Sequence, residues 1–137
     1  MNQRSLDRLK GVKQVLIDIL IKAHADSPYP FEVPPAGGIR TAEEQNALFV
    51  RKASTKDGYI KRSNHQDGKA VDIYLNKEVK MWDAEKLEKV ARHIQAVALD
   101  EFKIKLYWGG DWDGDGLTKA QGDKDEKFID YPHLELR

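Results

Sequence analysis

The chain has 137 residues, no cysteine and a formal net charge of zero. This length predicts one domain spanning residues 1–137, large enough to form a core without disulfide bonds. Because there is no cysteine, disulfides and thiolate metal sites are excluded, and any metal must be held by His and carboxylate side chains. The balanced charge argues against nucleic-acid binding, which favours a strongly basic surface.

The first segment is expected to form one long amphipathic helix. Apolar residues recur at helical spacing between Leu9 and Ala23, which predicts a helix over residues 4–25. Asp18 and Lys22 interrupt the apolar stretch, so we expect neither a signal peptide nor a membrane-inserted segment. The protein is therefore expected to be made in a cytoplasm without its own export signal.

The middle of the chain alternates between short strands, a helix and a long loop. Thr41, followed three residues later by Glu44, is a capping box that marks the start of a helix. The predicted elements are a strand at 31–33, a helix at about 42–53, a loop at 54–69, and strands at 70–75 and 78–82.

The last part of the chain is expected to contain a third helix and further strands. Asp83 is a good N-cap for this helix, and an apolar stripe from Leu87 to Ala98 follows it. The later elements are a strand at 103–108, a Gly/Asp-rich loop at 109–127 and an interrupted terminal strand at 128–129 and 133–136. This order predicts an α+β fold in which about three helices flank a small, mainly antiparallel sheet.

Two histidines and one aspartate form the most informative constellation. His65 lies at the end of the polar loop, and Asp72 lies on the next strand, on the face opposite Val71 and Ile73. With His133 they supply two imidazoles and one carboxylate, a ligand set that leaves one position on zinc open. A single carboxylate leaves the ion net positive, which lowers the pKa of bound water. We therefore expect a zinc site at the sheet.

Asp130 is the candidate catalytic base. Residues three apart on a regular strand point to opposite faces, but Pro132 cannot donate a strand hydrogen bond and biases Tyr131 away from helix. A break at this point would bring the side chains of Asp130 and His133 to the same metal. Asp130 would then take a proton from the attacking water and return it to the leaving amine.

The motif around the first histidine carries a family resemblance. Ser63, His65, Gly68, Ala70 and Asp72 fall in a pattern that resembles the S-x-H-x-x-G-x-A-x-D signature of the D-alanyl-D-alanine peptidase family of zinc enzymes. The resemblance covers most of the chain. It implies zinc on the two histidines and the aspartate named above, and a helix-flanked antiparallel sheet. It also places Ser63 among the substrate-binding residues.

The second motif separates the branches of that family. Branches that cleave D,D bonds usually carry Glu-x-x-His, whereas this chain has Asp130 and Pro132 before His133. In this the chain looks more like the L-alanyl-D-glutamate endopeptidases of phage endolysins, as does its segment 109–112. The resemblance implies an acid/base carboxylate at position 130 and hydrolysis of bacterial peptidoglycan. It also implies a monomer that reaches the wall through a separate pore-forming protein.

Cationic residues near the motif have two interpretations. Arg40 is either a surface charge or, as the resemblance suggests, a contact for the substrate or the developing oxyanion. The basic segment 51–62 is either a solvated loop or an electropositive rim that attracts the carboxylates of wall peptides.

An acidic segment suggests a second cation. Asp111, Asp113 and Asp115, followed by Gly116, match the first half of an EF-hand calcium loop. Position 12 would be Gly122 rather than the expected glutamate, so an ordinary Gly/Asp surface loop is the alternative. Calcium bound here would order the loop and switch activity on.

Three other functions fit part of the pattern. Two histidines and a carboxylate also make the facial triad of non-haem iron oxygenases, although the first pair is widely spaced here. A D,D-carboxypeptidase or D,D-dipeptidase of the same family is a second alternative. A zinc-containing wall-binding module without catalysis is the third, and the presence of Asp130 argues against it.

Overall fold

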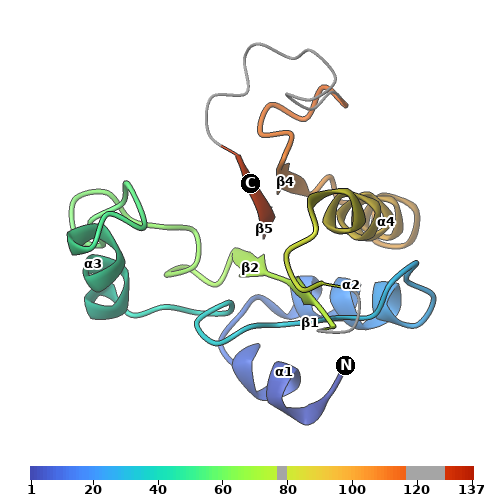
Figure 1. The fold of residues 1–137 in the computed structure, drawn as a ribbon, viewed down its shortest axis with the longest axis horizontal. Helices are drawn as coiled ribbons and strands as arrows, with labels where there is room; N and C mark the ends of the chain where they lie inside the picture. Colours follow the sequence, from blue (N-terminus) through green and yellow to red (C-terminus); the bar gives the residue numbers. More distant parts are fainter. Residues whose placement is uncertain (77–79, 117–128) are drawn as a thin grey trace.

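The computed structural model describes residues 1–76, 80–116 and 129–137, which form an α+β fold (Figure 1). Figure 1 shows helix α3 on one side of the strands and α4 on the other. The predicted fold class is confirmed, with four helices among these described residues in place of about three. The elements are α1 (Gln3–Arg8), α2 (Gln14–His24), β1 (Phe31–Glu32), α3 (Ala42–Val50), β2 (Ala70–Asp72), β3 (Tyr74–Leu75), α4 (Ala84–Phe102), β4 (Tyr107–Gly109) and β5 (Asp130–Glu135).

The prediction of one helix over residues 4–25 is wrong, because the chain breaks between α1 and α2. Gly11 has φ +92°, a conformation that cannot continue an α-helix and that glycine adopts readily. The Lys13 amide, at the start of α2, donates to the Gly68 carbonyl at 2.8 Å. The break therefore allows the start of α2 to bind the turn that follows His65 through this hydrogen bond.

The other helices begin at the predicted capping residues. Thr41 and Glu44 form a complete capping box at α3, and the Asp83 side chain accepts from the Lys86 amide at α4. Helix α3 ends at Val50, three residues earlier than expected, and Lys52 then turns into the left-handed region at φ 63°.

The strands form two antiparallel sheets. One pairs β1 with β3, and the other has the order β2-β5-β4. The strand predicted at 70–75 is therefore divided at Ile73, whose amide donates to the Pro132 carbonyl at 3.0 Å. The strand predicted at 103–108 begins only at Tyr107, because Lys103 caps α4 in the left-handed conformation.

Two further predictions meet the limits of the described residues. The strand predicted at 78–82 lies partly outside them. Its described part, 80–82, is not a strand, because residues 81–82 form a turn. Residue 128 of the predicted terminal strand also lies outside the described residues. Among the described residues, β5 runs without a break from Asp130 to Glu135, so the interruption predicted between 129 and 133 is wrong. Within the described part of the chain, no helix has the length and apolar character needed to cross a membrane.

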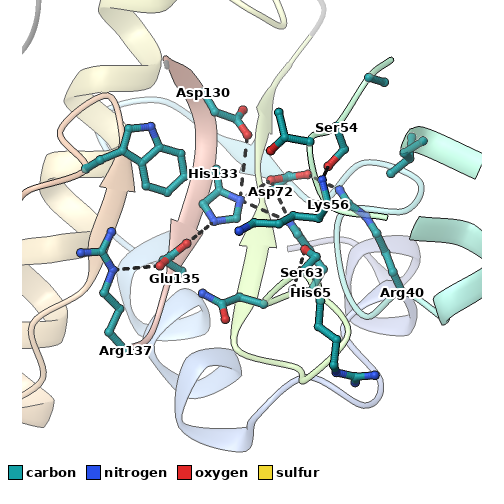
Figure 2. A pocket seen from close by; sticks show the side chains of 16 residues that line it. Arg40, Ser54, Lys56, Ser63, His65, Asp72, Asp130, His133, Glu135 and Arg137 are labelled. Carbon is teal, nitrogen blue, oxygen red and sulfur yellow. Dashed lines mark hydrogen bonds and ion pairs between the residues drawn. The ribbon is translucent and has the colours of Figure 1, made fainter. Parts of the chain in front are cut away.

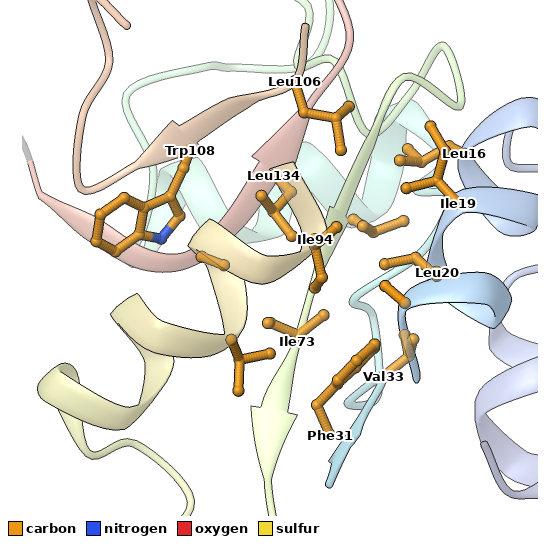
Figure 3. Close-up of a cluster of buried hydrophobic side chains, with 14 of the residues drawn as sticks. Leu16, Ile19, Leu20, Phe31, Val33, Ile73, Ile94, Leu106, Trp108 and Leu134 are labelled. Atoms are coloured by element: carbon orange, nitrogen blue, oxygen red, sulfur yellow. The ribbon is translucent and has the colours of Figure 1, made fainter. Parts of the chain in front are cut away.

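The core lies between the paired helices α2 and α4 and the strands (Figure 3). Figure 3 shows side chains from both helices directed toward those of the strands. The fully buried members include Leu16, Ile19, Leu20, Phe31, Val33, Ile73, Ile94, Leu106, Trp108 and Leu134. Since side chains alternate along a strand, the polar positions of β2 and β5 face away from this core. That polar face carries the candidate site.

Candidate functional site

Strand pairing brings the predicted ligands together. In the β2–β5 ladder Asp72 lies directly opposite His133. Val71 and Ile73 are fully buried, so Asp72 projects from the other face, as the alternation of the sequence predicted. His65 comes from the turn just before β2, and the Arg40 amide donates to its carbonyl at 3.2 Å. Residues distant in sequence thus meet at one place.

The facing atoms of these three side chains form a nearly equilateral triangle. Asp72 Oδ1 lies 3.4 Å from both His65 Nε2 and His133 Nδ1, and these two nitrogens lie 3.3 Å apart. Zinc bonds of about 2.0–2.1 Å in tetrahedral geometry separate two ligand atoms by about 3.3–3.4 Å. Asp72 Oδ1 is buried with no hydrogen-bond partner in the described residues, and a cation would supply one. The residues therefore fit a metal ion of this kind.

Each imidazole is oriented by a bond on its far side. His65 Nδ1 donates to the Gly38 carbonyl at 2.9 Å, which leaves Nε2 facing the triangle. His133 Nε2 lies 2.8 Å from Glu135 Oε1, which leaves Nδ1 facing the triangle. Metal-ligating histidines are commonly fixed in this way by a carbonyl or a carboxylate.

Glu135 and Arg137 extend the support of His133, and the sequence analysis missed both. Arg137 Nε donates to Glu135 Oε2 at 2.9 Å, and the guanidinium lies 3.8 Å from the centre of the Tyr107 ring. Burial raises the pKa of Glu135, but its bonds to His133 and Arg137 prevail and lower it to about 2. The usable signal was strand alternation, since every second residue shares the face of His133.

The electrostatics of His133 and Asp72 are coupled in the metal-free protein. Burial lowers the pKa of His133, but its contacts with the carboxylates of Asp72 and Glu135 reverse this and raise it to about 9. Burial raises the pKa of Asp72, but its contacts with His133 and His65 hold it well below the usual range. A metal ion held by these side chains would compete with protons for His133, so its affinity would depend on pH.

Asp130 borders the triangle without belonging to it (Figure 2). Its Oδ2 lies 4.0 Å from His133 Nδ1. The strand register explains this approach: Trp108 pairs with Leu134, whereas its neighbour Gly109 pairs with Asp130. A side chain on Gly109 would collide with the Asp130 carbonyl. This irregularity, which the sequence predicted near Pro132, directs the side chains of Asp130 and His133 toward the same cleft.

The environment of Asp130 suits proton transfer. Burial and the nearby negative charge of Asp72 both raise its pKa. The side chain remains about a third exposed, at 37%, so water and substrate can reach it. A carboxylate with a raised pKa is a better proton carrier near neutral pH than an ordinary aspartate.

Arg40 supports the second oxygen of Asp72. Its Nη2 lies 3.1 Å from Asp72 Oδ2, Nη1 donates to Gln45 Oε1 at 3.2 Å, and Nε donates to the Ala36 carbonyl at 3.1 Å. Gln45 is fully buried and was not identified from the sequence. Arg40 thus lines the wall of the site, and each of its hydrogen bonds named here is made to another part of the protein.

The site opens into a cleft of about 550 Å³. Ser63 lines this cleft, and its hydroxyl oxygen accepts from the His65 amide at 3.2 Å. The opposite wall includes Trp112, whose ring lies 5.1 Å from that of His133. The remaining wall is formed by residues 53–56, which follow α3, so the basic segment borders the candidate metal site.

The acidic segment forms a separate cluster. Ligand atoms of Asp111, Asp113 and Asp115 lie within 4.8 Å of one another. Asp111 is buried; its Oδ2 pairs with Arg92 Nη1 at 3.0 Å, and its Oδ1 has no hydrogen-bond partner in the described residues. The residues expected to complete a calcium loop, including Gly122, lie outside the described part of the chain.

Comparisons with known proteins identify related chains. The crystal structure of the L-Ala D-Glu endopeptidase ChiX from Serratia marcescens is similar over 100% of this chain and 89% of that chain, with a TM-score of 0.76 and 26% identity. No curated protein matches at a significant level. The family model for phage L-alanyl-D-glutamate peptidase matches residues 1–137. The chain belongs to the phage L-alanyl-D-glutamate peptidase family.

Proposed function

We propose that this chain is a zinc-dependent endopeptidase of the phage endolysin type, which hydrolyses the L-alanyl-D-glutamate bond in peptidoglycan stem peptides. The family match and the similarity to ChiX support the bond that is cut. The observation that carries the zinc assignment is the triangle of His65, Asp72 and His133, whose 3.3–3.4 Å sides match tetrahedral zinc. Zinc held by these residues would supply Lewis acidity to the scissile carbonyl and make water a better nucleophile.

The side chains around the triangle have distinct proposed roles. Asp130 accepts the proton of the attacking water and delivers it to the leaving amine, which converts a poor leaving group into a neutral one. Arg40 holds Asp72 in place and contributes positive charge beside the developing oxyanion. Ser63 fixes the turn that carries His65 and borders the bound peptide.

The test is digestion of purified peptidoglycan by the zinc-loaded protein, with mass spectrometry of the released fragments. We expect new N-terminal D-glutamyl residues on the peptides and L-alanine left on the glycan strands. Release of terminal D-alanine would instead favour a D,D-peptidase. Intact peptidoglycan would favour a non-catalytic wall-binding module. The Asp130→Asn variant, assayed in parallel, controls for contaminating wall hydrolases.

We also propose that Asp111, Asp113 and Asp115 bind calcium. The buried, unpartnered Oδ1 of Asp111 supports a cation at this position. Calcium would order the segment after Trp108 and so complete the cleft wall that contains Trp112. Calorimetry with added calcium tests the site, and activity with a calcium-selective chelator tests its effect. Absence of binding heat up to millimolar calcium would remove this proposal without affecting the zinc assignment.

The route to the wall is part of the same proposal. An enzyme of this type accumulates in the host cytoplasm as a monomer and reaches peptidoglycan when a separate protein opens the inner membrane. Expression alone should then leave cells intact, whereas co-expression with a pore-forming protein should cause lysis.

A further inference from the structure

The cleft contains four cationic side chains, and three of them are already paired. Arg40 pairs with Asp72 at 3.1 Å, and Arg62 pairs with Asp67 at 2.9 Å. Arg137 pairs with Glu135 at 2.9 Å and stacks on an aromatic ring. The fourth cation is Lys56, whose ammonium has no ion-pair or hydrogen-bond partner in the described part of the chain.

The backbone of Lys56 is nevertheless firmly held. Its carbonyl accepts from Gln45 Nε2 at 2.9 Å, and its amide donates to Ser54 Oγ at 3.1 Å. Gln45 is fully buried and also accepts from Arg40, which in turn contacts Asp72. The buried Gln45 and the partly exposed Arg40 therefore connect the Lys56 backbone to a candidate metal ligand. These contacts fix the backbone position from which the Lys56 side chain lines the cleft.

The position of Lys56 suits a group just beyond the scissile bond. It lines the same cleft as the metal triangle and Asp130. In Figure 2 it lies on the side of the cleft occupied by Arg40 and Ser63, across from Glu135 and Arg137. Its exposure leaves the ammonium open to an incoming ligand.

The substrate of the proposed function supplies an anion at this position. A D-glutamyl residue has two carboxyl groups, and in a stem peptide the γ-carboxyl continues the chain. The α-carboxylate stays free and is attached to the same carbon as the amide nitrogen that is cut. An enzyme that binds this bond must therefore place a negative charge beside its reaction centre, close to Asp72, Asp130 and Glu135. This is unfavourable without a cation that compensates the charge of the substrate.

We propose that Lys56 binds the α-carboxylate of the D-glutamyl residue, and that this contact makes the enzyme prefer D-glutamate over its amidated form, D-isoglutamine. The inference rests on the proposed L-alanyl-D-glutamate endopeptidase activity. Amidation removes the charge and leaves the shape of the peptide nearly unchanged, so it isolates the contribution of the ammonium–carboxylate contact.

The test compares two synthetic stem peptides that are identical except at one group. One carries the α-carboxylate of D-glutamate (the acid), and the other carries the α-carboxamide of D-isoglutamine (the amide). The zinc-loaded enzyme should cleave the acid with a kcat/KM roughly tenfold higher than the amide, as expected for one charge-assisted hydrogen bond. Lys56→Gln should lose this preference by slowing cleavage of the acid alone, and Lys56→Arg should restore most of it. Lys61→Gln, which removes the same charge from the same segment outside the cleft, should keep the wild-type ratio.

Binding measurements give a readout that does not depend on turnover. In the Asp130→Asn background, calorimetry should show tighter binding of the acid than of the amide, and adding Lys56→Gln should equalise the two. Unchanged zinc content would show that the variant leaves the metal site intact. A wild-type enzyme that treats both peptides alike, or a Lys56→Gln variant that retains the preference, would overturn the inference. Failure to cleave either peptide would instead contradict the proposed function, and the binding comparison would still decide the role of Lys56.

Discussion

Glu135 Oε1 lies 2.8 Å from His133 Nε2, on the opposite side of the ring from the nitrogen that faces Asp72 and His65. This contact fixes the rotation of the imidazole and the position of its proton. It also places a charged carboxylate in the protein interior, where its bond to Arg137 compensates it. The candidate metal site thus depends on residues that do not contact the ion.

The first prediction concerns this support. Glu135→Gln keeps the size of the side chain but removes its charge, so zinc affinity should fall by roughly 10–100-fold. The measurement is competition for zinc against a chromophoric chelator. Glu101→Gln, on the exposed end of α4, is the matched control and should leave affinity unchanged. Equal affinities for the two variants would contradict the positioning role.

The second prediction uses the pH dependence of the metal-free protein. The pKa of Glu135 is lowered from 4.5 to about 2, so its stabilising contribution is complete above pH 4.5 and is lost as the pH falls toward 2. The pKa of His133 is raised from 6.5 to about 9, so its contribution is complete below pH 6.5 and is lost as the pH rises through 9. The free energy of unfolding should therefore differ most between wild type and Glu135→Gln at pH 4.5–6.5. Urea titrations of the metal-free proteins from about pH 2 to about pH 9 measure it. A difference that stays constant below pH 4.5 and above pH 6.5 would exclude the charged pair.

The third prediction concerns the ligands. Purified protein should contain about one zinc per chain, and His65→Ala, Asp72→Ala or His133→Ala should each lose it, because zinc catalytic sites use three protein ligands. Elemental analysis measures the content. His93→Ala, on α4 and hydrogen-bonded to Asp26, is the control histidine and should retain the metal. Iron in place of zinc in the wild type would favour the oxygenase alternative.

The fourth prediction separates catalysis from metal binding at Asp130. Asp130→Asn preserves the shape of the side chain but cannot accept a proton, so turnover should fall by roughly 10²–10⁴-fold while zinc content stays constant. Turbidity loss of peptidoglycan suspensions measures the rate. A variant with nearly normal turnover would exclude Asp130 from the mechanism.

The fifth prediction concerns the basic segment 51–62. If its exposed cations attract the carboxylates of wall peptides, activity should fall as salt rises, because the screening length shortens from about 10 Å at 0.1 M to about 3 Å at 1 M. The effect should appear in KM more than in kcat. Salt-independent kinetics would support the alternative in which this segment is an ordinary solvated loop.

The sequence was most informative where local patterns determine the structure. The capping residues Thr41 and Asp83, and the alternation around Asp72, each depend on a few neighbouring residues, and all three predictions are confirmed. The break at Gly11 could not be read from the apolar pattern, because it depends on a contact with the distant Gly68 turn. The same holds for the supporting network.

That network consists of long-range contacts between ordinary polar residues. Gln45 lies within a helix and has no motif, and its importance follows only from the simultaneous approach of Arg40 and the 54–56 segment. Glu135 was accessible in principle, because it follows His133 by two residues on a strand. Recognising it required knowing that the strand is regular from His133 to Glu135, although its pairing with β4 is irregular between Asp130 and Leu134.

The β2–β5 register has a consequence for how the enzyme becomes active during folding. Asp72 and His133 are opposite one another only when Val71 pairs with Leu134, and a slip of one residue would turn one of the two side chains into the core. A metal with ligands on both strands would stabilise this register of β2 and β5 relative to other registers. High metal affinity would therefore be a property of the correctly assembled chain alone. Chains with the wrong alignment, or with β5 not yet docked, would remain without metal and without hydrolytic activity.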